Sequence, residues 1–367
     1  MTTTLLFVAG ASLAGVNVLS ALAGRRAGLR LVATNSVAEE PALGDFDEAF
    51  LIPPLRPDSA AFERRFLEVL ASVQPRLVIP CRDDDLLYLA RLQESDPAWC
   101  GRFLCGSVET ARATLDKAVS WEFSSRHGLP FAPTVRLDAA PDAVRAFARE
   151  HDFPLIIKPA EGFASRGVNL LVDSEQVSRA LGRPGYVLQK YLDDPDAVIG
   201  YARSLANEGI PLFHTFETVK RSVQAFIAPD GEIAGVFATC NTMRYGKSER
   251  IRIDDDPEAS ALGRRCAQVF AAQGWRGPLN IQCQRAPSGE LLIYEFNGRF
   301  TGATAGRFLL GYDEVGLALR TFVGWDDGSS RTPPSRAREV VKLPQSRVVD
   351  PGVTAALERT GHWRAPG

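Results

Sequence analysis

The segment that most constrains the fold of this chain spans residues 279–299, with the sequence LNIQCQRAPSGELLIYEFNGR. Apolar and polar residues alternate from Leu279 to Gln284, which is the period-two pattern of a half-buried strand. Residues 291–296 are rich in aliphatic and aromatic side chains, which favour a second strand. A Pro-Ser-Gly turn signal separates the two runs. We therefore expect a β-hairpin.

The register of this hairpin decides which polar side chains meet. A two-residue turn at residues 288–289 pairs Pro287 with Glu290, and it also pairs Gln282 with Glu295.

The expected pairing collects oxygen ligands on one face of the hairpin. Asn297 lies two residues beyond Glu295, so both side chains point to the same face as Gln282. One carboxylate and two amides suit Mg²⁺, which keeps several waters and is shared with substrate phosphates. A surface hairpin with a polar face is the alternative interpretation of this segment taken alone.

Composition places the chain among ordinary globular proteins and excludes several classes of function. The 367 residues allow two or three domains, with 45% apolar and 23% charged residues. A net charge of -2 gives no broad attraction to nucleic acid or to anionic membranes. The six cysteines are scattered without a CxxC pair, which indicates free thiols in a reducing cytosol. We expect a cytoplasmic protein with no nucleic-acid or membrane partner.

Strands and helices alternate in the first part of the chain. Strands are expected at residues 4–9, 29–34 and 77–80, and helices at 10–24, 62–73 and after the Asp-rich turn 83–85. This alternation predicts a Rossmann-like parallel sheet with helices on both faces, over residues 1–110.

The regular alternation of strands and helices ends at about Ser107. The expected elements are a helix from Ser107 that carries Asp116 and Lys117, strands at 153–159, 168–172 and 186–192, an irregular insertion at 193–216, a hairpin at 223–239 and a helix at 258–273. Residues from Ser329 onward receive no interpretation beyond a linker and a short C-terminal element.

Lysine is scarce, so each lysine is informative. Lys117, Lys158 and Lys190 fall on three elements that could converge on one nucleotide, because lysine is a compact charge suited to phosphate. Lys158 directly precedes a loop rich in small residues, 162–167, in which backbone N–H groups could approach oxyanions. Solvated surface charges and a plain hairpin connection are the alternatives for each feature alone.

Taken in order, these motifs resemble the ATP-grasp superfamily, in the branch of carbamoyl-phosphate synthase and related carboxylate–amine ligases. The resemblance covers residues 1–325 approximately. It rests on four segments: Asp116-Lys117, IIKPAEGFASRGV (156–168), LQKYL (188–192) and GPLNIQCQ…LLIYEFNGR (277–299).

The resemblance implies a fold and a set of ligands. After the N-terminal domain it implies a two-lobed ATP-grasp domain at residues 111–328, with a lid subdomain at about 130–187, and a tail or short element at 329–367. The implied cofactors are ATP and Mg²⁺, with Mn²⁺ as an alternative metal. The implied metal ligands are Gln282, Glu295 and Asn297.

The resemblance also implies roles for single residues. Arg299 and Lys158 would act on the transferring phosphate and be catalytic. The residues implied to bind nucleotide are Lys117, Lys158, Gly162, Ser165, Gly167, Gln189, Lys190, Leu192 and Asp196. Two departures from the family pattern concern the nucleotide: Asp196 lacks the usual surrounding motif, so Glu217 is an alternative, and Gln189 replaces a carboxylate.

The function implied is an ADP-forming ligase that activates a carboxylate as an acyl-phosphate and couples it to an amine. The expected partners are small-molecule acids and amines, and a homodimer is a family expectation only. Arg244 and Arg250, in a basic segment at 241–252, are candidates to hold a substrate carboxylate, with a solvated loop as the alternative. Arg299 is a further candidate to bind substrate, through the acyl-phosphate. Two other functions stay open: a carbamoyl- or carboxyphosphate-forming enzyme, and a non-catalytic ATP sensor.

Overall fold

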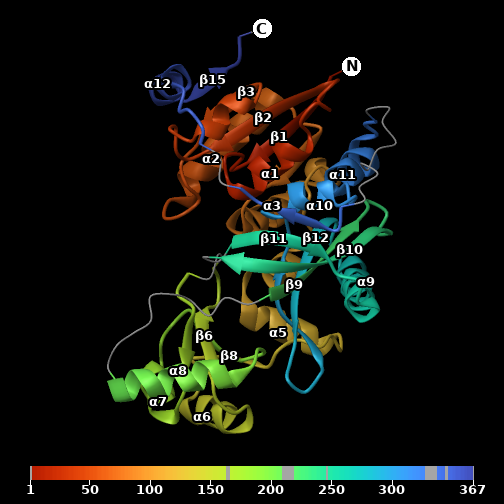
Figure 1. The fold of residues 1–367 in the computed structure, drawn as a ribbon. Coiled ribbons are helices and arrows are strands. Elements are labelled where there is room, and N and C mark those ends of the chain that lie inside the picture. Colours follow the sequence, from red (N-terminus) through yellow and green to blue (C-terminus); the bar gives the residue numbers. More distant parts are fainter. Residues whose placement is uncertain are drawn as a thin grey trace.

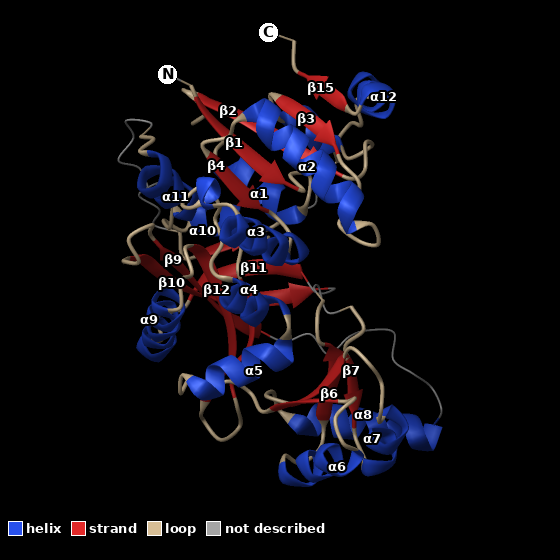
Figure 2. Cartoon of the chain, turned by 180° about the vertical axis from the view of Figure 1, so that it is seen from behind, coloured by secondary structure: helices blue, strands red, loops and turns tan. Residues whose placement is uncertain are grey.

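The computed structural model describes residues 2–162, 166–208, 219–244, 247–326, 337–343 and 346–366. These residues form three β-sheets (Figure 1). One sheet contains the N-terminal strands, a larger one lies in the middle of the molecule, and a small one forms a separate lobe with its own helices (Figures 1 and 2). The predicted α/β and α+β architecture is confirmed.

The N-terminal sheet has the order β15-β3-β2-β1-β4, and its first four strands along the chain run parallel. Its elements are β1 (Thr3–Val8), α1 (Leu13–Ala21), β2 (Leu29–Asn35), a 3-10 helix (Pro41–Asp45), β3 (Glu48–Leu51), α2 (Ser59–Val73), β4 (Leu77–Pro80) and α3 (Asp83–Ser95). The expected turn at 83–85 is instead the first turn of α3. Strand β3 was not expected, because four residues containing a glutamate carry too little periodicity.

The C-terminal region returns to this N-terminal sheet. Helix α12 (Pro351–Thr360) leads into β15 (His362–Arg364), which pairs antiparallel with β3. The His362 ring stacks on Phe50 at 4.5 Å between centroids, and its Nε2 lies 2.6 Å from Glu48 Oε1. Both ends of the chain therefore contribute to one sheet, at the top of Figure 1.

A short connection of helices follows the N-terminal sheet. After a 3-10 helix (Pro97–Trp99), α4 spans Val108–Leu115 and α5 spans Lys117–Arg126. The single helix expected to carry Asp116 and Lys117 is wrong. Asp116 ends α4 and caps α5, since its carboxylate accepts the N–H groups of Ala118 and Val119. Lys117 consequently begins the second helix.

The small lobe has a core of its own. Its sheet has the order β5-β8-β6-β7 and comprises β5 (Thr134–Arg136), β6 (Leu155–Pro159), β7 (Asn169–Leu171) and β8 (Tyr186–Lys190), with α6 (Pro141–Glu150) and α7 (Ser174–Ala180). Leu137, Val144, Leu155, Ile157 and Leu188 belong to its apolar cluster. The insertion expected at 193–216 to be irregular is helical in part, as α8 (Pro195–Glu208), and residues 209–218 lie outside the described part.

The largest sheet is antiparallel and has the order β13-β12-β9-β10-β11-β14. Its elements are β9 (Val219–Ile227), β10 (Ile233–Arg244), β11 (Lys247–Ile253), α9 (Pro257–Ala272), β12 (Gly277–Arg285), β13 (Leu291–Asn297) and β14 (Glu339–Val341). Helices α10 (Thr304–Leu309) and α11 (Glu314–Val323) lie between β13 and β14 along the chain. One apolar cluster runs from the N-terminal sheet, through Val8 and Phe66, to Ile281 and Phe296 of this sheet. The two sheets thus share a core, which the small lobe does not.

The hairpin β12–β13 keeps the predicted pairing of Gln282 with Glu295, although its turn differs from the expectation. The turn contains three residues, because Ala286 rather than Pro287 faces Glu290, with a hydrogen bond of 2.8 Å from Ala286 N to Glu290 O. A register shift between Gln282 and Cys283 then leaves one additional residue on β13, at position 294. The longer turn shifts the register by one residue and this bulge shifts it back, so the pairing around Gln282 and Glu295 is the predicted one.

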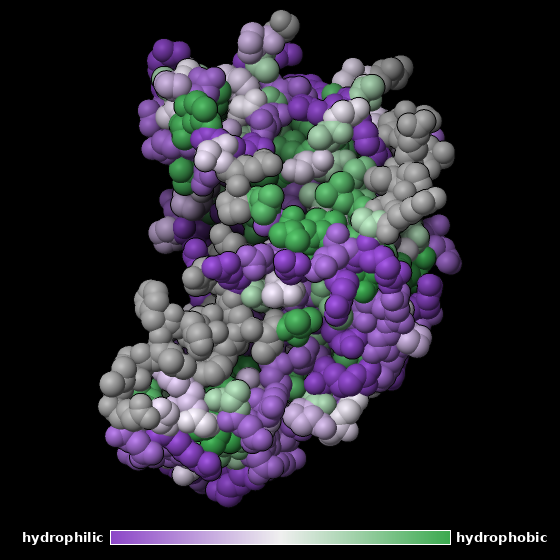
Figure 3. Space-filling model, viewed as in Figure 1, coloured by the Kyte–Doolittle hydropathy of each residue, from purple (hydrophilic) through white to green (hydrophobic). Residues whose placement is uncertain are grey.

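None of the helices in the described ranges is both long and apolar enough to cross a membrane. The face seen in Figure 3 is largely hydrophilic over the small lobe, and its hydrophobic side chains gather mainly on the upper body.

Gly298, which links the end of β13 to Arg299, offers a test of the packing. A Cβ here would lie 2.3 Å from Trp275 Cη2 and 3.0 Å from Thr114 Oγ1. Trp275 is fully buried and donates its Nε1–H to Pro278 O, so it has little freedom to move. We expect Gly298→Ala to destabilise the protein by about 1–3 kcal/mol, seen as a lower thermal midpoint. Gly200→Ala is the control, because nothing lies within 4 Å of that Cβ in helix α8. An unchanged midpoint for Gly298→Ala would contradict the packing described.

Candidate functional site

A cleft of about 570 Å³ lies where the three sheets approach one another. Its walls come from the turns after β1 and β4 of the N-terminal sheet, from the loop after β6 of the small lobe, and from one face of the large sheet. The carboxyl ends of parallel strands are the usual place for ligands in α/β sheets. The lining residues after β4 include Arg82 and, in the first turn of α3, Asp83 and Asp84, none of which was predicted from the sequence to be functional.

Gln282, Glu295 and Asn297 line one end of this cleft together. Gln282 faces Glu295 across the hairpin, and Asn297 follows on the same strand. Asn297 is 4% exposed, its Oδ1 accepts a hydrogen bond from Arg299, and its buried Nδ2 has no partner among the described residues. One carboxylate and two amides are an oxygen donor set, which fits a magnesium ion shared with phosphates. Within the described ranges there is no cluster of three or more His, Cys, Asp and Glu side chains that could hold a metal.

Lys117 is held beside this donor set by the start of α5. Its Nζ lies 3.3 Å from Glu295 Oε1 and donates to the carbonyl oxygens of Ala160 and Gly162. Its backbone N–H also bonds Ala160 O at 3.0 Å. The lysine therefore joins three elements: α5, the loop after β6 and the hairpin.

Lys158 reaches the same place from β6. It is 6% exposed, and its Nζ donates to Tyr294 O at 3.3 Å and lies over the Tyr294 ring. Burial first, and the nearby charge of Lys117 second, lower the pKa of Lys158 to about 7. The side chain is thus close to half-charged at neutral pH until an anion arrives.

Arg299 completes the set of cations. Its Nη2 donates to Asn297 Oδ1 at 3.1 Å and lies 2.5 Å from Asp83 Oδ2, and its Nη1 donates to Phe300 O at 3.3 Å. Asp83 belongs to α3 of the N-terminal domain, 216 residues away. A contact of such sequence separation has no local signal, which is why sequence reasoning missed Asp83.

The residues expected around adenine and ribose lie near the strand β8 and its end. Gln189 is buried and donates to Thr134 Oγ1 at 2.9 Å, and Leu192 packs in a small apolar cluster with Ala132 and Leu292. Lys190 ends β8 and is half-buried. Asp196 is exposed, and it lines neither the cleft of about 570 Å³ nor the smaller cavity of about 220 Å³ at the end of β8.

A second cavity of about 220 Å³ adjoins the end of β8. It is lined by Asp193 and Asp194, with Leu192 and residues of the β12–β13 hairpin. Asp193 pairs with Lys220 and accepts from Gln284 at 2.5 Å. These aspartates, rather than Asp196, are the carboxylates that the structure places close to the expected nucleotide-binding strand.

The remaining candidates are dispersed. Gly162 lines the cleft, and Gly167 lies at the other end of the loop with φ +73°, a conformation that glycine adopts readily. Ser165 and Glu217 lie outside the described residues.

The two arginines proposed to hold a substrate carboxylate do not line the cleft. Arg244 pairs with Glu249 at 3.1 Å, and Arg250 pairs with Glu339 at 3.2 Å. Both arginine side chains are more than half exposed, as the alternative of a solvated segment expects.

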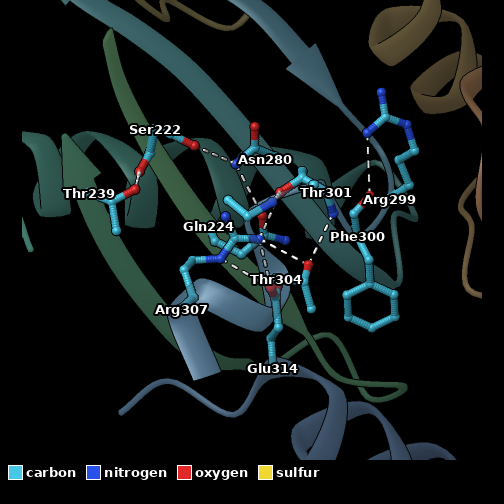
Figure 4. Close-up of polar contacts among 12 residues, drawn as sticks. Ser222, Gln224, Thr239, Asn280, Arg299, Phe300, Thr301, Thr304, Arg307 and Glu314 are labelled. Carbon is cyan, nitrogen blue, oxygen red and sulfur yellow. Dashed lines mark hydrogen bonds and ion pairs between the residues drawn. The ribbon is translucent and has the colours of Figure 1, made fainter. Parts of the chain in front are cut away.

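Buried polar contacts join residues that line the cleft to residues behind them (Figure 4). Asn280 donates to Ser222 Oγ and to Gln224 Oε1, which joins β12 to β9. Arg307 of α10 is fully buried, pairs with Glu314 at 2.6 Å and donates to the hydroxyl oxygens of Thr301 and Thr304. The buried ion pair thus fixes the loop after Phe300, whose Thr301 lines the cleft.

Comparisons with known proteins agree with this architecture. No family model matches the chain. A D-alanine–D-alanine ligase of Methylococcus capsulatus is 28% identical over 206 residues, which are 54% of this chain. The chain spans about three fifths (61%) of the length of that curated relative.

Two solved structures share the fold at low sequence identity. The biotin carboxylase domain of 2-oxoglutarate carboxylase from Hydrogenobacter thermophilus, in complex with Mg-ADP, ADP and bicarbonate, is 18% identical, with a TM-score of 0.64 over 89% of this chain and 70% of that one. An L-amino acid ligase from Bacillus licheniformis is 13% identical, with a TM-score of 0.62 over 88% of this chain and 74% of that one. The chain therefore has the ATP-grasp fold, and its likenesses are to ligases and carboxylases of that superfamily.

Proposed function

We propose that the cleft binds Mg-ATP and a small carboxylic acid, forms an acyl-phosphate and ADP, and transfers the acyl group to an amine. One observation carries the proposal: Lys117, Lys158 and Arg299, from three elements, meet around the oxygen donors of the β12–β13 hairpin. Such a group of cations suits the triphosphate and the transferring phosphate.

The chemistry needs positioning and charge neutralisation more than it needs a protein nucleophile. A carboxylate oxygen of the acid attacks the γ-phosphorus, and ADP leaves with the bridging oxygen. The amine then attacks the acyl carbon, and inorganic phosphate leaves. Magnesium held by Gln282, Glu295 and Asn297 would neutralise charge on the phosphates.

The cations of this chain have distinct parts in that scheme. Lys117 Nζ lies 3.3 Å from Glu295 Oε1, and it would be available to phosphate if a metal ion were held by that carboxylate. Lys158 gains full charge when an anion binds, because the anion offsets the burial that lowers its pKa.

Exclusion of water from the acyl-phosphate is the remaining requirement. The loop after β6 carries Glu161, which pairs with Arg56 of the N-terminal domain at 2.7 Å. This pair links the small lobe to the opposite wall of the cleft, and both residues line it. The separate core of the small lobe is suited to motion of the lobe as a unit.

Formation of carboxyphosphate from bicarbonate is the second candidate, because the similar biotin carboxylase domain was solved with bicarbonate. Glu295, Asn297 and Arg299 line one cleft, and Lys158 donates to Tyr294 O beside them. This set of side chains argues against a non-catalytic sensor. Small-molecule acids and amines are the partners we propose, and self-association as a homodimer stays a proposal.

ADP release tests this function. With Mg-ATP and pooled amino acids, we expect ADP release that requires an acid and an amine, and we expect Glu295→Ala to lower it by about a hundredfold or more, because a metal ligand is lost. Glu175→Ala is the control, since that exposed glutamate pairs with Arg179 on its own helix, α7, and does not line the cleft. Chelation with EDTA should stop the reaction and added Mg²⁺ should restore it. Tight ATP binding without release in any pool, bicarbonate included, would speak against a ligase.

The low pKa of Lys158 predicts that nucleotide affinity depends on pH. The lysine is charged below its pKa of about 7, so at higher pH its neutral amine must take up a proton when a phosphate binds. We expect the affinity for Mg-ADP to fall by up to about tenfold for each pH unit above 7. Isothermal titration calorimetry in buffers of different ionisation enthalpy should show proton uptake. Lys158→Arg stays charged and should bind with little pH dependence; an equally steep dependence in that variant would exclude Lys158 as its source.

A further inference from the structure

The first turn of α3 brings three aspartates to the edge of the cleft, and they differ in their surroundings. Both carboxylate oxygens of Asp85 accept from Arg82, at 2.9 and 3.2 Å, and the side chain is fully buried. Asp84 lines the cleft. Asp83 alone contacts Arg299, and each of these two side chains is 14% exposed.

We propose that Asp83 is a positioning residue that holds the Arg299 guanidinium in the orientation needed to bind the transferring phosphate. The proposal rests on the phosphate role given to Arg299 in the proposed function. Asp83 does not touch the reacting atoms in this scheme and acts through Arg299.

The hydrogen bonds of Arg299 allow Asp83 to orient the guanidinium without competing with a phosphate for its donors. A guanidinium has five N–H donors. The Nη2 group is used by Asp83 and Asn297, and one Nη1–H by Phe300 O. The second Nη1–H and the Nε–H have no partner in the part of the chain that the structure describes. The arginine can therefore bind a phosphate oxygen with these donors while it keeps its contact with Asp83.

Burial and the nearby charge of Arg299 also act on the Asp83 carboxylate. Asp83 has its pKa raised mainly by burial, and Arg299 opposes that shift. Asp83 Oδ1 is buried without a partner in the described ranges, so the carboxylate is not free to turn to solvent. Arg299 in turn contacts Asn297, one of the proposed metal ligands. Asp83 thereby links the N-terminal domain to the phosphate end of the ATP-grasp hairpin.

Binding of inorganic phosphate to the Mg-ADP complex tests the proposal without need of turnover. We expect Asp83→Ala to weaken phosphate binding about 10- to 100-fold, as happens when residues that orient a binding side chain are removed. Asp83→Asn keeps an acceptor and loses the charge, so its loss should be smaller. Mg-ADP affinity should change by less than about twofold in both variants. With turnover as the readout, kcat should fall while the KM for ATP changes little.

Asp85→Asn is the matched control, because Asp85 lies in the same turn, is also paired with an arginine and does not line the cleft. It should lower the thermal midpoint and leave phosphate affinity within about twofold. In an Arg299→Gln background, Asp83→Ala should have no further effect.

Three results would overturn the assignment of Asp83: unchanged or tighter phosphate binding in Asp83→Ala, an equal loss in Asp85→Asn, or a full effect of Asp83→Ala without Arg299. Failure of the proposed function gives a different pattern. Phosphate binding would depend on Asp83 and Arg299, while the unmodified protein would release no ADP with any acid and amine.

Discussion

The antiparallel pairing of β12 with a strand on each side determines the chemistry of the cleft. On one side Gln282 faces Glu295 of β13, and on the other it faces Ser222 of β9. Ser222 of β9, Asn280 and Gln282 of β12, and Glu295 and Asn297 of β13 line the cleft, so a single register sets amides, a hydroxyl and one carboxylate side by side. A slip by one residue would turn the whole row into the apolar core. Lys117 of α5 and Lys158 of β6 contact residues of β13, so their positions depend on this register.

Much of the fold was accessible from the sequence where local signals were strong. The strand–helix alternation of the first hundred residues and the hairpin around residues 229–232 were assigned correctly, because periodicity and turn residues are properties of neighbouring positions. The break between α4 and α5 at Asp116 was missed, because an aspartate in a helical pattern can lie within a helix or cap the start of a new one. Helix α8 was expected to be irregular although Val198, Ala202 and Leu205 recur at helical spacing, so its apolar pattern was misread.

Some of the candidate site residues could be predicted from the sequence, and others could not. Lys117, Lys158, Glu295 and Asn297 were singled out from motif order, and the structure brings them into one place. Asp83 and Ser222 were not found, because their role comes from contacts between distant segments. The buried pair of Arg307 and Glu314 was also out of reach: a charge in a helix is normally read as exposed, and here both partners are buried beneath the loop that they hold. Such pairs add little net stability and are more readily explained as fixing one conformation of a loop.

Strand β15 can pair with β3 only late in the synthesis of the chain. Strand β15 supplies the edge beside β3, yet its residues are synthesised after nearly all the others described. Until then, the backbone groups of β3 on that side face the surroundings, at a time when the ribosome still holds the chain. A growing chain must therefore carry an incomplete sheet through the synthesis of more than three hundred residues. Pairing of β15 with β3 is therefore a long-range event, because the two strands are separated by most of the described chain.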